Sequence, residues 1–295
     1  MKKLFFMISA IFLPFSSNAW EACGTDASGN TANCEYQIDA SGTLTIRGTG
    51  NNGSIGYWYS SSQDKTIQPW KNKSVTNVVI EDTIKDLGSY GFRSITSVNP
   101  IEIPNSITTI SGFAFYGVLT SEVIIPDSVT KIKTAAFNWS ELQKINIPDS
   151  VTSIENAFRG TGLKDIVIPD SVTSISGGAF NYCTNLQSIT IGENTQLGKI
   201  FTGPDSDTEF TDIANLKIYC TGDTEKCDAN LAAAGYGELR TSKATTKQIN
   251  GVTYVYDKNG KLVTTSGHRS EKRIYTIEEA NEVSGPINRV SITYR

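Results

Sequence analysis

The stretches Ile125-Pro-Asp-Ser-Val-Thr-Lys-Ile132, Ile147-Pro-Asp-Ser-Val-Thr-Ser-Ile154 and Ile168-Pro-Asp-Ser-Val-Thr-Ser-Ile175 decide the fold of this 295-residue chain. They begin 22 and 21 residues apart, so the chain repeats itself at a nearly fixed period. A period of this size is typical of repeat proteins, in which each repeat forms one coil and neighbouring coils stack. The sequence therefore predicts a solenoid.

Isoleucine anchors set the register of the repeat. They lie at intervals of 23, 22, 22, 21 and 23 residues, at Ile80, Ile103, Ile125, Ile147, Ile168 and Ile191. A β-branched residue lies two positions before each anchor, as Val78, Ile101, Val123, Ile145, Ile166 and Ile189. Alternate residues of an extended chain face the same side, and β-branched side chains suit a pleated surface. The pattern predicts one short strand in each repeat.

Further residues recur after the anchors. A proline follows four of them directly and ends strand pairing, at Pro104, Pro126, Pro148 and Pro169. Asn105-Ser106 and three Asp-Ser pairs then turn the chain, and we expect their side chains to bond local backbone. A phenylalanine closes each unit, at Phe92, Phe115, Phe137, Phe158 and Phe180. One such coil buries its apolar face only against its neighbours, so the array should be cooperative.

The three opening stretches, each followed by Ala-Phe, resemble BspA-type leucine-rich repeats, and the resemblance covers residues 75–220. It implies a leucine-rich-repeat solenoid, β-rich, with a parallel sheet on its concave side. It also implies a surface or secreted bacterial protein, since several members of that family are adhesins. We expect neither catalytic residues nor a cofactor in this chain.

The segments that flank the repeats predict two caps and a tail. Residues 20–74 contain two alternating stretches, Tyr36–Ile38 and Thr43–Arg47, and form an N-terminal β cap. Residues 221–240 form a C-terminal cap with a helix from Asp223 to Ala234 that ends at Gly235. Residues 241–295 form a small α+β tail module, with a hairpin turned at Asn259-Gly260, a helix from Thr276 to Ser284 and a strand from Arg289 to Tyr294.

The N-terminus indicates export. Lys2 and Lys3 precede an apolar run from Leu4 to Phe15, and Ser17-Asn18-Ala19 supplies the small residues of a signal-peptidase site. We expect residues 1–19 to be removed, and the mature protein to be secreted or held at the cell surface, with the periplasm as an alternative. A lipid anchor on Cys23 is disfavoured because bulky, charged Trp20-Glu21 precedes it.

Five cysteines fall into two close pairs and one single residue. Export favours disulfides Cys23–Cys34 and Cys220–Cys227, each closing a small loop. A zinc site would need four ligands at workable spacing, whereas the one histidine, His268, lies far from either pair. We interpret Cys183 as a small buried apolar residue rather than a reactive thiol.

Charge and composition disfavour several functions. Removing Lys2 and Lys3 lowers the net charge from −4 to −6, and the remaining basic residues are scattered, which argues against nucleic-acid binding. His268 lies in a polar stretch without a partnered nucleophile, so we expect no enzyme activity. Acidic residues cluster at Asp205, Asp207, Glu209 and Asp212, but without the spacing of an EF-hand, so no metal is expected.

Two groups of residues are candidate binding surfaces for an extracellular protein or glycan. The first consists of outward strand positions, which align into an extended face, at Glu102, Ile124, Gln143, Lys144, Asn146, Lys164, Asp165, Gln187 and Thr190. The second consists of the loops after the phenylalanines, with Tyr116, Trp139, Arg159 and Tyr182. Tyr57-Trp58-Tyr59 and Trp70 are expected to cover the end of the core rather than to bind sugar. The alternative functions are a structural envelope component without an external ligand and, less favoured, a hydrolase.

Overall fold

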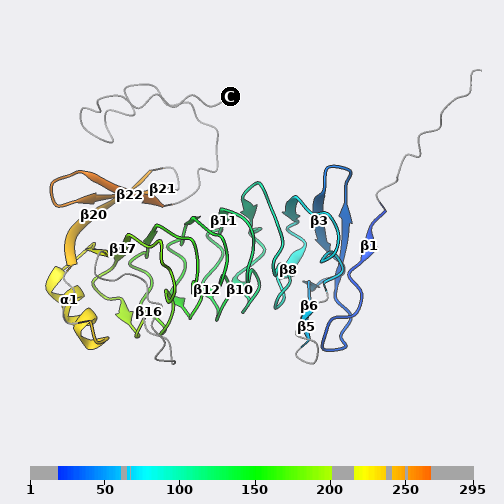
Figure 1. Cartoon of the computed structure of the whole chain (residues 1–295), viewed down its shortest axis with the longest axis horizontal. Coiled ribbons are helices and arrows are strands. Elements are labelled where there is room, and N and C mark those ends of the chain that lie inside the picture. The colour runs from blue at the N-terminus through cyan, green and yellow to red at the C-terminus, as the bar shows by residue number, and fades with distance from the viewer. Residues whose placement is uncertain are drawn as a thin grey trace, which may run out of the picture.

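The chain is a solenoid of stacked coils in the computed structural model (Figure 1), which describes residues 19–60, 65–66, 68–200, 216–236, 241–249 and 252–266. The predicted signal sequence before Ala19, the acidic cluster of residues 205–212, His268 and the predicted elements at 276–284 and 289–294 lie outside these ranges.

The anchor strands line one side of the solenoid, which we call the anchor sheet. Neighbouring strands pair in parallel, except between the first and second and between the fourth and fifth of them. They are β7 (Asn77–Ile80), β9 (Ile101–Glu102), β11 (Glu122–Ile124), β13 (Lys144–Ile145), β15 (Asp165–Val167), β17 (Ser188–Ile191) and β19 (Lys217–Cys220). Val123 of β11 is in register with Ile101 and Ile145, the residues that precede the anchors of the two neighbouring coils. The repeat period read from the sequence is therefore the period of the sheet.

A second parallel sheet runs along the solenoid, so each coil contains two short strands rather than the one predicted. It consists of β10 (Thr109–Ile110), β12 (Lys131–Ile132), β14 (Ser153–Ile154), β16 (Ser174–Ile175) and β18 (Gln196–Leu197), paired in that order. Buried backbone N–H and C=O groups need partners, and coils stacked in register offer them at this corner too. Regular stacking of the coils thus creates a second ladder of backbone hydrogen bonds. Its strands are only two residues long, too short to show an alternating side-chain pattern in the sequence.

Phenylalanines and serines hold the coils together. Phe92, Phe115, Phe137, Phe158 and Phe180 are fully buried and stack in sequence, with ring centroids 5.0 to 5.7 Å apart. The serine hydroxyls of residues 106, 128, 150 and 171 each donate a hydrogen bond to a main-chain carbonyl of the preceding coil. The expectation that they bond local backbone was wrong, because the corner that they form faces the previous coil.

The N-terminal cap extends the anchor sheet and covers the first coil. Its strands are β1 (Glu21–Ala22), β2 (Cys34–Ile38), β3 (Thr43–Gly48), β4 (Gly53–Ser54), β5 (Tyr59–Ser60) and β6 (Lys65–Thr66), and β4 pairs with β8 (Ile84–Asp86). Antiparallel β1, β2 and β3 meet the repeats where β3 pairs in parallel with β7. The structure contains the Cys23–Cys34 disulfide.

Two tryptophans of this cap close the end of the apolar core. Trp58 and Trp70 are each only 2% exposed, and the Trp70 ring stacks on Phe92 with centroids 6.4 Å apart. The Trp58 and Trp70 indole nitrogens donate to the carbonyls of Ile55 and Gly91. Both side chains therefore extend the phenylalanine stack into the cap, as expected from their size, and offer no platform to a sugar.

Helix α1 (Thr224–Ala233) begins the C-terminal cap, within a residue of the expected bounds. The Asp223 carboxylate accepts a hydrogen bond from the Glu225 N–H at the first turn, and Gly235 follows the helix with φ +92°. The Cys220–Cys227 disulfide joins β19 to the first turn of the helix. Both cysteines are fully buried, so the bridge lies within the apolar core of the cap.

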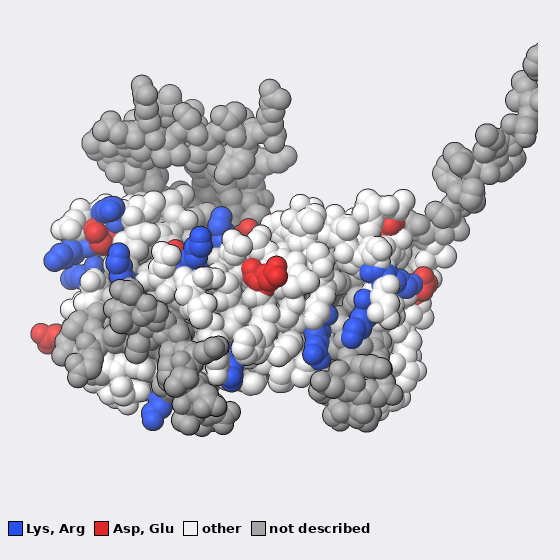
Figure 2. All heavy atoms as spheres, viewed as in Figure 1, with Lys and Arg blue, Asp and Glu red and all other residues white. Residues whose placement is uncertain are grey.

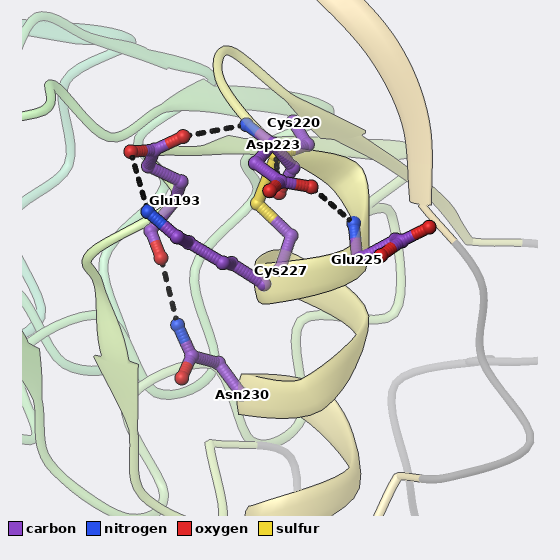
Figure 3. A network of polar contacts seen from close by, with 7 residues as sticks. Glu193, Cys220, Asp223, Glu225, Cys227 and Asn230 are labelled. Atoms are coloured by element: carbon purple, nitrogen blue, oxygen red, sulfur yellow. Dashed lines mark hydrogen bonds and ion pairs between the residues drawn. A yellow bond between two sulfur atoms is a disulfide. The ribbon is translucent and has the colours of Figure 1, made fainter.

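Glu193 ties α1 to the last repeat (Figure 3). Its carboxylate accepts hydrogen bonds from the Asp223 N–H at 2.6 Å and from Lys226 Nζ at 3.2 Å. Asn230 Nδ2 donates to the main-chain carbonyl of Glu193 at 3.0 Å, one helical turn further on. The Asp223 N–H, and after it Lys226, lower the pKa of Glu193 below its ordinary value. One acidic residue therefore fixes the helix in place.

A β-meander follows the cap and continues the anchor sheet. Strand β20 (Thr241–Ile249) pairs in parallel with β19, and β21 (Val252–Asp257) and β22 (Leu262–Ser266) follow in antiparallel order. The hairpin predicted around Asn259-Gly260 is present, with Gly260 at φ +75°. The long strand β20 was not predicted, because its polar sequence lacks an apolar alternation.

Candidate functional site

The strand face is the first candidate surface, comprising the nine outward positions from Glu102 to Thr190 named above. Glu102 and Ile124 are in register on neighbouring strands, and Lys144 is in register with Glu122. Glu102, Gln143, Lys144, Lys164 and Gln187 are exposed, while Ile124, Asn146 and Asp165 are half-buried. The sheet thus brings most of these residues onto one surface, which carries charges of both signs.

The C-terminal end of the strand face is covered. Thr190 is fully buried, and Val167, its register partner on β15, is 5% exposed. Val167 packs in a small apolar cluster with Ala244 and Val255 of the meander. The inclusion of Thr190 in an exposed surface was therefore wrong, because its environment is set by a meander that the repeat pattern does not encode.

Charged side chains form no continuous patch in the view of Figure 2. Lysines, arginines and acidic residues lie singly or in small groups among uncharged side chains, over both the repeats and the caps. Among the described residues, ion pairs join Arg47 to Glu35, Lys73 to Glu21 and Lys226 to Glu193, all in or beside a cap. The described part of the face shown therefore carries no large region of one charge sign that would attract a charged polymer from a distance.

The phenylalanine edge is the second candidate surface, and we define it as the residues from two positions before to two positions after each stacked phenylalanine. The backbone there adopts the left-handed conformation repeatedly. Two positions before, φ is positive at Tyr90 (61°), Phe113 (60°), Ala135 (56°) and Gly178 (75°). Two positions after, φ is positive at Ser94 (53°), Gly117 (64°), Trp139 (58°), Gly160 (67°) and Tyr182 (58°).

Large aromatic residues thus occupy backbone positions that suit glycine. Trp139 and Tyr182 share the conformation of Gly117 and Gly160, which hold the equivalent position in alternate coils. A left-handed conformation costs a residue with a Cβ atom about 1–2 kcal/mol. Bulky residues in this region are uncommon, and such strain gathers at functional sites more than elsewhere. These aromatic side chains are present at a cost in stability.

Trp139, Arg159 and Tyr182 form what we call the edge cluster. The two rings come from coils on either side of the Phe158 coil, yet their centroids are 5.5 Å apart and their planes are tilted by 40°. The Arg159 guanidinium lies 5.7 Å from the Trp139 centroid and 4.6 Å from the Tyr182 centroid, within cation–π range. Trp139 is 47% exposed.

Gly160 makes room for this arrangement. A Cβ atom on Gly160 would lie 2.5 Å from Cε3 of Trp139 and 2.9 Å from two other ring atoms. The indole therefore rests on the Gly160 backbone. The main-chain N–H of Trp139 donates a hydrogen bond to the main-chain carbonyl of Arg159 at 2.7 Å, and this bond fixes the backbone below the ring.

A second aromatic group lies nearer the N-terminus on the same edge. Tyr90 stacks on Phe113 with centroids 4.7 Å apart and contacts Tyr57 edge-on at 6.1 Å. Tyr116 lies beside both Tyr90 and Phe113. The Arg93 guanidinium lies 5.6 Å from the Tyr90 centroid and 5.3 Å from the Tyr116 centroid. An arginine against two aromatic rings thus occurs twice along the edge.

Sequence reasoning located part of this edge and missed the rest. Tyr116, Trp139, Arg159 and Tyr182 were expected at a variable edge, but Tyr90 and Phe113 were not, because they precede the phenylalanine. A signal was available in the repeats themselves. Glycine at 117, 160 and 178 marks two left-handed positions, so an aromatic residue at an equivalent position is conspicuous.

Groups capable of metal or redox chemistry are few in the described part of the chain. Within it, no three His, Cys, Asp or Glu residues lie close enough together to hold a metal ion. Cys183 is fully buried, its thiol contacts the Phe158 carbonyl at 3.0 Å, and burial raises the pKa of the thiol above its ordinary value. Among the same residues there is also no helix of the length and apolarity needed to cross a bilayer.

The comparison with protein families matches the repeats. The model of the BspA type leucine rich repeat region matches residues 68–187 and 154–202, in 6 copies. A comparison with curated proteins gave no significant match.

Three solved bacterial structures are similar to the chain. One is a leucine-rich repeat protein from Eubacterium ventriosum, with 19% identity, a TM-score of 0.36 and coverage of 78% of this chain and 47% of that one. Another is a leucine rich cell surface protein from Faecalibacterium prausnitzii, with 26% identity, a TM-score of 0.31 and coverage of 57% and 54%. The third is a leucine-rich repeat protein from Bacteroides ovatus, with 19% identity, a TM-score of 0.31 and coverage of 64% of each chain. The chain thus spans 47 to 64% of the length of these proteins.

The family assignment agrees with the geometry of the repeats. The matched residues contain the stacked phenylalanines and both parallel sheets of the solenoid. The family is one of bacterial repeat proteins that are in general not enzymes. Residues 68–202 therefore match the BspA type leucine rich repeat region, and the fold of this part of the chain is a leucine-rich-repeat solenoid.

Proposed function

We propose that this chain is an exported, non-catalytic protein that binds an extracellular protein or glycan through its phenylalanine edge. One observation carries the proposal: exposed Trp139 and half-buried Tyr182 occupy left-handed backbone positions that glycine fills in alternate coils. Glycine there would fold with less strain. Aromatic side chains kept at such positions are explained by an interaction outside the fold.

The residue types of the edge cluster suit binding. Tryptophan, tyrosine and arginine are the residues that contribute most to binding energy at interfaces, because each combines a large contact area with a polar group. Arg159 is held against both rings, so little side-chain freedom would be lost when a ligand arrives. The site is therefore organised before binding.

The strand face is the weaker of the two candidate surfaces. Its exposed residues are mostly single charged or amide side chains, and the meander covers its end at Val167. Flexible side chains of this kind, such as Lys144 and Lys164, each lose freedom on binding and gain little apolar contact. A ligand that needs a fixed, partly apolar surface is better served by the edge.

Export supports an extracellular partner. Two disulfides are present in the structure, and such bonds persist in oxidising compartments. The amino-terminal lysines, apolar run and Ser17-Asn18-Ala19 together form a secretory signal. The net charge of −4 and the scattered basic residues favour a protein or a glycan over a nucleic acid as the partner.

Arrays of extracellular glycans and matrix proteins test this proposal, with residues 20–295 as the probe. The double variant Trp139→Gly/Tyr182→Gly installs the residue of the alternate coils, and we expect it to fold and to lose its array signals. The comparison variant Lys144→Glu/Lys164→Glu reverses two charges of the strand face and should keep those signals. Loss in the charge-reversed variant with retention in the glycine variant would move the site to the strand face and contradict the proposal.

A further inference from the structure

We propose that the edge cluster is a subsite for an acidic saccharide, whose carboxylate is bound by Arg159 and whose ring lies on the outward face of Trp139. The inference rests on the proposed function and specifies the ligand of the same site. It is carried by three features of the cluster: the lack of an anionic partner for Arg159 among the described residues, the exposure of the Trp139 side chain and the small extent of the apolar surface.

Arg159 is a cation without an anionic partner in the described part of the chain. None of the ion pairs there includes it, and its Nε atom is buried without a hydrogen-bond partner among the described residues. The Trp139 and Tyr182 rings hold the guanidinium in place but use none of its N–H groups in hydrogen bonds. The buried Nε is out of reach of a ligand, but no hydrogen bond within the described residues uses the two terminal Nη groups either. These Nη groups favour a carboxylate, which they bind through two parallel hydrogen bonds.

Trp139 provides a flat apolar surface beside that cation. One face of the indole rests on the Gly160 backbone, and the Trp139 side chain is 47% exposed, so the opposite face is the one on which we place the sugar. The face of an aromatic ring carries partial negative charge and attracts partially positive C–H groups. A pyranose ring presents a flat set of C–H groups on one side, and its hydroxyls remain in water. The indole face and the guanidinium together match a sugar ring that carries a carboxylate.

The size of the apolar surface favours a saccharide over a folded protein. Standard protein interfaces bury about 800 Å² on each partner and have an apolar centre. The large apolar side chains that are well exposed in the described structure are Tyr57, Val79, Val98, Leu119, Trp139 and Leu262, and of these Trp139 alone belongs to the edge cluster. The edge cluster is therefore a local apolar site with polar surroundings, which suits one or two sugar rings.

The overall charge of the chain requires that recognition be local. With a net charge of −4, the protein does not attract anions from a distance. Selectivity for an acidic sugar then depends on direct contact with Arg159 rather than on a general basic surface. A variant that removes a positive charge elsewhere should leave binding unchanged. The contribution of Arg159 can therefore be measured separately from the effect of net charge.

Calorimetric titration of residues 20–295 with trigalacturonic acid and with its methyl ester tests the inference. The two probes share the sugar rings and differ in the charge of the carboxyl groups. We expect the acid to bind roughly tenfold more tightly, or more, because only the free carboxylate forms the charge-assisted pair. Arg159→Gln should remove this preference, and Arg159→Lys should keep only part of it, because lysine lacks the planar fork.

Two further variants separate the contribution of the ring from that of the charge. Trp139→Gly should weaken the binding of both probes while thermal stability holds or rises. Lys131→Gln removes one positive charge from exposed β12 and should leave both affinities unchanged. Equal binding of acid and ester, or an acid preference that survives in Arg159→Gln, would overturn the inference. Array signals that require Trp139 but belong only to neutral ligands would overturn it while leaving the proposed function intact.

Discussion

Trp139 and Tyr182 lie on opposite sides of the Phe158 coil, and their ring centroids are only 5.5 Å apart. Strands of neighbouring coils are separated by about 4.8 Å, so ring attachment points two coils apart are roughly 10 Å apart. The rings approach one another because the intervening coil carries Gly160, on whose backbone the indole rests. The edge cluster thus depends on a residue that contributes no side chain.

Gly160→Ala should therefore disrupt the cluster. The new Cβ atom would lie 2.5 Å from Trp139 Cε3, and φ is +67° at this position. We expect a loss of about 1–3 kcal/mol in the free energy of unfolding, together with displacement of the indole. Denaturant titration measures the first, and the change in tryptophan fluorescence between Gly160→Ala proteins with and without the further change Trp139→Phe reports the second. Gly50→Ala is a matched control, because φ is also +67° there and its Cβ atom would have no neighbour within 4 Å. Equal stability of the two variants would contradict this account.

The phenylalanine stack should dominate the stability of the repeats. Phe137 is fully buried between Phe115 and Phe158, with centroids 5.4 and 5.5 Å away. Phe137→Ala should cost about 3–5 kcal/mol, through lost burial and the cavity that remains. Phe137→Leu should cost less, since it retains most of the volume. Because each coil is stabilised by its neighbours, the Ala variant should also broaden the unfolding transition seen by denaturant titration. A sharp transition with unchanged midpoint would argue against nearest-neighbour coupling through this stack.

The sequence predicted those features of the fold that the repeat encodes in its side chains. The register of Ile101, Val123 and Ile145 follows from their spacing, and α1 follows from Asp223 and Gly235 at its ends. The second sheet was missed because its two-residue strands arise from stacking of the backbone, which no side-chain alternation marks. Strand β20 was missed for a related reason: its pairing with β19 supplies hydrogen bonds to a polar segment.

Less of the candidate site was predictable. The outward positions of the strand face follow from alternation, but the burial of Thr190 depends on contacts between segments distant in the sequence. The approach of Trp139 to Tyr182 depends on left-handed backbone and on the absent side chain of Gly160, which become apparent only when the coils are aligned with one another. The contacts of a loop residue in one repeat depend on the residues at the equivalent positions of the neighbouring repeats.

Cys183 should be inert in the folded protein. Its thiol is fully buried beside the Phe158 carbonyl and Thr161, and burial raises its pKa above the ordinary value of 9.0. The raised pKa keeps the neutral thiol predominant at mildly alkaline pH, where an exposed cysteine would react as the thiolate. Alkylation with iodoacetamide, followed by mass spectrometry, should modify Cys183 only after denaturation. Rapid modification of the native protein would show that this part of the core opens readily.

The attachment of α1 should depend on pH through Glu193. Hydrogen bonding to the Asp223 N–H and contact with Lys226 lower the pKa of Glu193 from its ordinary value of 4.5. A carboxylate with a lowered pKa in the folded state stabilises that state above the unfolded pKa, and the effect is lost as the pH falls through the folded pKa. Glu193→Gln should therefore weaken hydrogen-exchange protection of α1 at neutral pH, and the difference should vanish well below pH 4.5. Glu102→Gln, which makes the same charge change on β9, is the control and should leave α1 unaffected at every pH.

The β-meander should be the least stable of the described β structure outside the N-terminal cap. Besides the pairing of β20 with β19, its contact with the repeats is a small apolar cluster in which Val255 and Ala244 pack on Val167, whereas the repeats share one continuous core. Segments with few buried apolar contacts open at lower free energy than the global transition. Amide exchange should therefore be faster in β21 and β22 than in β15 and β17. Val255→Ser should accelerate it further without changing the exchange of the repeats, while Thr265→Ser, at an exposed position of β22, should have little effect. Simultaneous exchange of the meander and the repeats would instead mean that the two unfold as one unit, and that the covered end of the strand face stays closed until the whole solenoid opens.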